Sequence, residues 1–114
     1  MTGAVFSGDT LNKEMNMLPS ERLLIHREAI LEILGRYPRL SNLRVIGSVA
    51  RGEDAEGSDI DFFVDTAPGA TYFDIGGLYN DLESLLGVSF DIIISGDHLH
   101  EYMRMTIEKD AKAI

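Results

Sequence analysis

Three aspartates carry the chemistry that this sequence could perform. Asp59 and Asp61 stand two residues apart in the stretch GSVARGEDAEGSDIDFFVD, residues 47–65. Alternate side chains of a β-strand point to the same face, so two such carboxylates lie about 6–7 Å apart along the strand. They repel each other unless water, a cation or a metal ion neutralises them. The pair could bind hard cations, which prefer carboxylate oxygens, but an isolated Asp-x-Asp is also typical of a solvated strand face.

A third carboxylate would complete a site for two-metal phosphoryl or nucleotidyl transfer, in which carboxylates bridge two cations about 3.5–4 Å apart. Asp65 is too far away, at about 20 Å from Asp59 along an extended chain. Asp91 is the better candidate, because it lies between apolar neighbours of an expected strand. An unpaired carboxylate there would be costly and would need a metal, a cation or hydrogen-bond donors. Alone, however, such a residue is more often a structural carboxylate than a ligand.

Gly47 and Ser48 add a feature that suits phosphate. Glycine at a strand end lets a phosphate approach the backbone, and a helix that begins there supplies free N–H groups. Ser48 adds a hydroxyl donor, and Arg51 adds a permanent positive charge for phosphate oxygens. Residues 52–58 superficially resemble a Walker P-loop, but the lysine is missing, so we reject that interpretation.

Short elements of alternating type are expected to position these residues. Apolar periodicity and breaker residues predict, in order, a helix over 21–36, a strand over 43–46, a helical turn over 48–51, a charged loop over 52–57, a strand over 59–64, a helix over 75–86, a strand over 88–94 and a helix over 99–107. Ser20 is the expected N-cap of the first helix and Pro38 its end. The continuous apolar content of the third strand predicts burial on both faces. The fold class is α/β (α+β), a small mixed sheet flanked by helices.

The whole chain limits the classes of function. Its 114 residues suffice for one domain, expected over 19–114 after a flexible tail over 1–18. There is no cysteine, no secretion signal and no apolar run long enough to span a membrane, so a cytoplasmic location is expected. The net charge of −9 disfavours autonomous nucleic-acid binding. It suits a basic protein partner or divalent cations, although it could simply keep a small protein in solution.

Taken together, GSVARGEDAEGSDID resembles the motif of the DNA polymerase β-like nucleotidyltransferases: Gly-Ser, a short spacer, then Asp-x-Asp on the next strand. The Ala-Arg-Gly that follows Gly47-Ser48-Val49 and the serine before Asp59 are similar to the minimal nucleotidyltransferases. These are the antitoxin halves of HEPN–MNT toxin–antitoxin pairs. The resemblance extends over residues 20–114, with Phe90-Asp91-Ile92 in the place of the third-acid strand, whereas the C-terminal residues follow the family's ending only loosely.

The resemblance implies roles for individual residues. Asp59 and Asp61 match the metal-binding pair, and Asp91 matches the third acid, so that all three are expected to be catalytic and to bind metal. Gly47 and Ser48 match the residues that hold the nucleotide's phosphates; Arg51 is within the motif, with a less defined role. The implied cofactor is a pair of Mg²⁺ ions, with Mn²⁺ as a substitute, and the implied substrate is ATP.

The resemblance also implies an acceptor. Larger members of the superfamily carry an added domain that binds tRNA, DNA or an aminoglycoside, and this sequence shows none, so the acceptor is expected to be bound by a partner or to be the partner. The family implies a HEPN ribonuclease toxin in a hetero-oligomer, modified by AMP on a tyrosine hydroxyl. Two alternatives stay open. One is a non-catalytic antitoxin that acts by binding, and the other is a small-molecule nucleotidyltransferase.

Overall fold

A computed structural model describes residues 17–96 and 98–114. The elements follow the chain in the order α2 (Pro19–Ile25), α3 (Arg27–Leu34), β1 (Leu40–Ile46), α4 (Gly47–Arg51), β2 (Ile60–Thr66), α5 (Tyr72–Leu86), β3 (Phe90–Ile94), α6 (Glu101–Asp110) and β4 (Lys112–Ala113). The tail expected over 1–18 lies outside the described residues except for its last two, so that domain boundary stays a prediction. No described helix is both long and apolar enough to cross a bilayer.

The four strands form one mixed sheet in the order β3-β2-β1-β4. β1 and β2 are antiparallel neighbours, and β4 adds antiparallel to the other side of β1. β2 and β3 are parallel, and α5 makes the crossover between them. The predicted mixed sheet flanked by helices is therefore confirmed.

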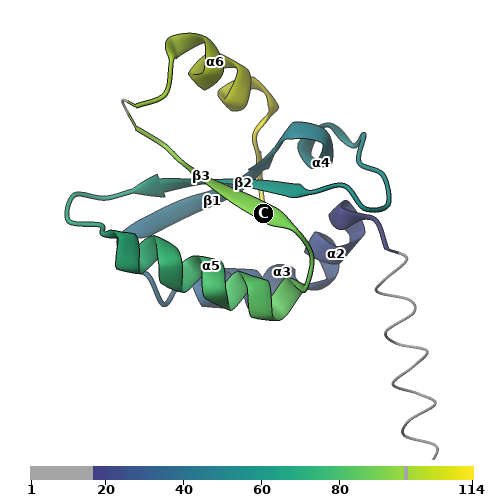
Figure 1. Ribbon diagram of the computed structural model, residues 1–114, viewed down its shortest axis with the longest axis horizontal. Helices are drawn as coiled ribbons and strands as arrows, with labels where there is room; N and C mark the ends of the chain where they lie inside the picture. The colour runs from purple at the N-terminus through teal and green to yellow at the C-terminus, as the bar shows by residue number, and fades with distance from the viewer. Residues whose placement is uncertain (1–16, 97) are drawn as a thin grey trace, which may run out of the picture.

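Two apolar clusters lie on opposite faces of the sheet. Alternate residues of β2, namely Ile60, Phe62 and Val64, are fully buried in the larger cluster, with α3 and α5. Phe63, which points the other way, belongs to a smaller cluster with Ile107 of α6. Figure 1 shows the sheet between these layers, with α3 and α5 on one side and α4 and α6 on the other. We call the side that faces α4 and α6 the carboxylate face.

The first helix begins two residues earlier than expected. Its N-cap is Leu18, with Pro19 as the first helical residue, so the prediction of Ser20 as N-cap is wrong. The fixed φ of proline suits the first helical position, which moves the cap to the residue before it. The Leu18 N–H is bonded to Glu21 Oε1 at 2.9 Å, and the Ser20 N–H donates to Asp54 Oδ2 at 2.9 Å.

The helix predicted over 21–36 is in fact two helices, α2 and α3. They are interrupted at His26, which has φ −94° and ψ 9°. The sequence contains neither glycine nor proline at this point, so no local pattern indicates the break. α3 then ends at Leu34 with Gly35 as its C-cap, so the prediction that Pro38 ends the helix is also wrong.

The third strand is shorter and less buried than predicted. β3 is an edge strand, so burial on both faces is not found: Phe90 is buried, Asp91 is exposed and the three isoleucines that follow are half-buried. The apolar run has a different cause. The strand is only half-buried, but its isoleucines still pack against the apolar clusters on the two faces of the sheet. The two-residue strand β4 was not predicted at all.

Candidate active site at the carboxylate face

The site is assembled by the register of three strands. Asp61 of β2 is paired with Ile46 of β1 on one side and with Asp91 of β3 on the other. Neighbouring strands lie about 4.8 Å apart, and residues in register point to the same face. The carboxylates of Asp61 and Asp91 therefore stand side by side on the carboxylate face. Gly47 and Ser48 follow Ile46 directly, so the Gly-Ser turn lies at the same end of the sheet.

Gly47 lies against the Asp61 carboxylate. Its φ is +71°, a left-handed conformation that side chains rarely adopt, and a Cβ placed on it would lie 3.0 Å from Asp61 Oδ2. Any other residue here would be strained and would push against this carboxylate. Glycine is therefore favoured at this position for two structural reasons, which are the left-handed backbone of the turn and its close approach to Asp61.

Asp59 lies just outside the strand on which it was predicted. β2 begins at Ile60, whose N–H donates to the carbonyl of Ser89 at 3.2 Å, and Asp59 is exposed in the preceding loop. Its charge nevertheless reaches Asp61. Burial, then the charge of Asp91, then that of Asp59 raise the pKa of the Asp61 carboxyl above its ordinary value. Asp61 therefore interacts electrostatically with both of the other predicted acids.

Asp91 is not the buried carboxylate that its apolar neighbours predicted. Its side chain is exposed on the edge strand, so an unpaired carboxylate there carries no large desolvation penalty. The correct reason to consider it is its register with Asp61. Exposure also leaves the Asp91 carboxylate accessible to an incoming molecule.

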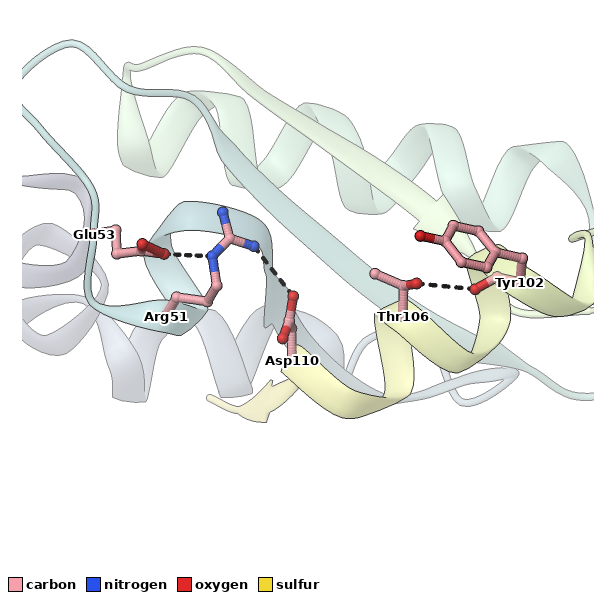
Figure 2. Close-up of polar contacts among 5 residues, drawn as sticks. All are labelled: Arg51, Glu53, Tyr102, Thr106 and Asp110. Carbon is pink, nitrogen blue, oxygen red and sulfur yellow. Dashed lines mark hydrogen bonds and ion pairs between the residues drawn. The ribbon is translucent and has the colours of Figure 1, made fainter.

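Arg51 is engaged by two carboxylates. Its Nε donates to Glu53 Oε1 at 2.6 Å and its Nη1 to Asp110 Oδ2 at 3.1 Å, which ties α4 to the end of α6. Figure 2 shows this bridge, with Tyr102 and Thr106 further along the same helix. The prediction that Arg51 binds nucleotide stays a prediction. No local pattern indicates a role for Asp110, because its contact with Arg51 depends on how α6 folds back over the sheet.

Asp65 lies on the same strand face but has partners of its own. Its carboxylate accepts hydrogen bonds from the Arg44 guanidinium and from Asn42 Nδ2, the latter at 3.0 Å. Burial alone would raise the pKa of Asp65, but hydrogen bonds from Asn42 and Ser95 and the charge of Arg44 outweigh it and lower that pKa. Asp65 is therefore a paired structural carboxylate, in contrast to Asp61.

The carboxylate oxygens of Asp59, Asp61 and Asp91 are the kind of ligand that a hard cation prefers. Among the described residues, no hydrogen bond or ion pair joins Asp59, Asp61 or Asp91 to another side chain. Burial, and then the like charges of the other two acids, raise the pKa of Asp61. Over 17–96 and 98–114, no three acidic, histidine or cysteine side chains yet converge on one point that could hold a metal ion. A bound cation would have to draw these carboxylates together, and doing so would relieve their repulsion.

A separate apolar cavity of about 310 Å³ lies between α2, α4 and β4. Leu23 and Val49 are among its lining residues, and none of Asp59, Asp61 and Asp91 lines it. We therefore do not include this cavity in the site.

Stability should depend on pH through Asp61. Because its pKa is raised on folding, the native state binds this proton more tightly, so the raised pKa contributes stability at low pH. That contribution is lost as pH rises from the ordinary value of 3.8 through the raised one. Asp61→Asn should therefore melt at a higher temperature than wild type at neutral pH, with a difference that closes toward pH 3, as followed by circular dichroism without metal.

Asp65→Asn is the matched control for that measurement. Its pKa is lowered on folding, so its charge contributes stability that is present at neutral pH and lost in acid. This variant should melt at a lower temperature than wild type at neutral pH, the opposite sign. Equal effects of the two substitutions at every pH would contradict the distinction between an unpaired and a paired aspartate.

Comparison with known proteins identifies the family. A model of the nucleotidyltransferase domain matches residues 26–114. A candidate protein adenylyltransferase of Methanocaldococcus jannaschii, MJ0128, is 33% identical over 79 residues, which cover 69% of this chain and 81% of the relative. A second from that organism, MJ0126, is 31% identical over 91 residues, 80% of this chain and 92% of the relative.

Solved structures agree with the fold. A candidate minimal nucleotidyltransferase is 39% identical with a TM-score of 0.72, over 83% of this chain and 95% of that one. A toxin–antitoxin structure with AMP-PNP has a TM-score of 0.61 at 21% identity, over 84% of this chain and 72% of that one, which shows a shared fold alone. The chain therefore belongs to the nucleotidyltransferase domain family, as a minimal nucleotidyltransferase of the DNA polymerase β-like superfamily.

Proposed function

We propose that this protein transfers AMP from ATP to a hydroxyl group of a cognate HEPN ribonuclease, on a tyrosine, and thereby acts as its antitoxin. The observation that carries the proposal is the register that sets Asp61 beside Asp91 and opposite Ile46, the residue that directly precedes the Gly-Ser turn. Relatives of similar length that are named as candidate protein adenylyltransferases support a protein acceptor. The AMP-PNP in a toxin–antitoxin structure of the same fold supports an adenine nucleotide and a toxin partner.

Each site residue has a role in the proposed transfer that follows from its position in the fold. Gly47 and Ser48 lie where the backbone and a hydroxyl can hold phosphates, and Asp91 lies exposed on the edge, where it can accept a proton from the incoming hydroxyl. Asp59 and Asp61, with Asp91, would hold Mg²⁺, which supplies neutralisation of the triphosphate and of the charge that develops on transfer. The acceptor oxygen forms a bond to the α-phosphorus as pyrophosphate leaves with the electron pair of the broken P–O bond.

The test is co-expression of the protein with the ribonuclease encoded beside it, followed by intact-mass measurement of the ribonuclease. Wild type should protect the cells and add the mass of AMP to the ribonuclease. Asp59→Ala/Asp61→Ala should fold, because two like charges near one strand end are removed, and should bind the ribonuclease without protecting cells or adding mass. Full protection by the double variant, with no added mass in either case, would show instead a non-catalytic antitoxin.

A further inference from the structure

The outer edge of β3 presents backbone groups that the sheet does not use. The Ile60 N–H donates to the carbonyl of Ser89 at 3.2 Å, and the Ser95 N–H donates to the carbonyl of Val64 at 2.9 Å. These two bonds fix the phase of the parallel ladder, since the backbone groups of a strand alternate in direction. The residues whose backbone N–H and C=O groups point toward β2 are Ser89, Asp91, Ile93 and Ser95. The residues whose backbone groups point outward, away from the sheet, are Phe90, Ile92 and Ile94.

This edge lacks several of the devices that protect a sheet edge against further pairing. β3 contains no proline and no lysine, and its register with β2 runs without a bulge over all five residues. Natural proteins use such devices to block the addition of another strand. In the described part of the chain, no element pairs with the outer side of β3. An extended segment of another polypeptide could therefore continue the sheet at this edge.

We propose that the acceptor polypeptide binds as an additional strand along β3, with its acceptor residue directly opposite Asp91. The proposal rests on the proposed AMP transfer and names how the substrate is held. In an antiparallel addition, the residue opposite Asp91 forms a non-hydrogen-bonded pair, with Cα atoms about 4.5 Å apart. Its side chain points to the same face as Asp91, which is the carboxylate face. The pairing alone thus delivers a hydroxyl to the site.

The neighbours of Asp91 indicate which segment fits. Ile93, two residues further on the same face, belongs to the apolar cluster of Phe63 and Ile107, so an apolar residue two positions from the acceptor would pack there. The three acids at the site and the net charge of −9 favour basic residues at the ends of the segment. A basic, extended, alternating segment is therefore the expected substrate class.

Transfer of AMP to a hydroxyl opposite Asp91 needs no reactant other than ATP and the acceptor. The acceptor O–H gives its proton to the Asp91 carboxylate as its oxygen bonds to the α-phosphorus of ATP. The bond from that phosphorus to the bridging oxygen breaks, and pyrophosphate leaves with the electron pair. The products are the adenylylated side chain, pyrophosphate and one proton, which Asp91 returns to water.

A backbone N-methyl scan of a peptide substrate tests the proposal. The probe is Lys-Lys-Thr-Val-Thr-Tyr-Thr-Val-Thr-Lys-Lys, and AMP transfer from labelled ATP is measured with Mg²⁺ for peptides methylated at one nitrogen each. An N-methyl group that faces β3 removes a hydrogen bond and should lower transfer about tenfold or more. One that faces away should have little effect. In an antiparallel addition the sensitive nitrogens are those of the two residues that flank the tyrosine.

The expected result is therefore an alternation with a period of two residues, and its phase reports the direction of the added strand. Equal tolerance at all nitrogens would overturn the proposal. No transfer to any peptide, with Mg²⁺–ATP still bound, would overturn it as well. Loss of nucleotide binding itself would instead overturn the proposed function, so the two failures are distinguishable.

A variant of the protein gives an independent test. The Ile92 N–H points outward, so Ile92→Pro removes a donor from the open edge but no bond to β2. Transfer to the peptide should fall about tenfold or more, with Mg²⁺–ATP affinity unchanged, whereas Ile92→Val, which keeps the N–H, should retain it. If Ile92→Pro converts a dimer to a monomer in light scattering without affecting transfer, the edge pairs two copies of this chain and the proposal is wrong.

Discussion

Asp91→Asn should lower the rate of AMP transfer by about 10²- to 10⁴-fold, which is the usual contribution of a positioned general base. Asparagine keeps the size of the side chain but cannot accept the proton of the acceptor hydroxyl. Because Asp91 is exposed on an edge strand, the substitution should not unfold the protein. Binding of ATP should weaken only modestly, since Asp59 and Asp61 remain.

Asp65→Asn is the matched control, because it removes the same charge from the same side of the sheet. Asp65 is held by Arg44 and lies four residues beyond Asp61, outside the site. Rates are measured with wild-type protein and both variants at one temperature below the melting point of each. Unchanged transfer by Asp91→Asn would remove this residue from the site.

Gly47→Ala should lower transfer by about a hundredfold, the effect of displacing a reacting group by about 1 Å. The added Cβ would meet Asp61 Oδ2 at 3.0 Å and would force the carboxylate or the turn to move. The positive φ should also reduce the free energy of unfolding, by about 1–2 kcal/mol. Transfer rates and chemical denaturation measure the two effects separately.

Gly52→Ala separates backbone strain from the contact. Gly52 has the same φ of +71° as Gly47, but a Cβ placed on it would meet nothing within 4 Å. This variant should lose a similar amount of stability and keep its transfer rate. Equal losses of activity in both variants would show that the approach of Gly47 to Asp61 has no part in the reaction.

Features with a local cause could be predicted from the sequence. The helix that ends at Gly87, the helical turn after Gly47 and the strand around Asp61 all follow from residues within a few positions, such as a left-handed glycine at φ 64°. The motif itself is local, because its Gly-Ser turn and its aspartates all lie between the end of β1 and the first residues of β2, separated only by the rest of α4 and one short loop.

Features that depend on tertiary contact could not be predicted. The break at His26 has no breaker residue, and the two-residue strand β4 exists only because β1 offers an edge to Lys112 and Ala113. The position of Asp91 shows the limit most clearly. Its apolar neighbours suggested a buried strand, whereas its place beside Asp61 depends on the strand order, which the periodicity of one strand does not contain.

Titration calorimetry with ATP, in Mg²⁺ or Mn²⁺ and again in EDTA, tests the central claim most directly. The account holds that Asp61, which is repelled by the charges of Asp91 and Asp59, binds a triphosphate together with these two carboxylates through divalent cations. ATP should therefore bind appreciably only when the metal is present, and Asp59→Ala/Asp61→Ala should bind weakly in both conditions. Equal affinity of the wild-type protein for ATP with and without EDTA would contradict the account and leave these aspartates as a solvated surface.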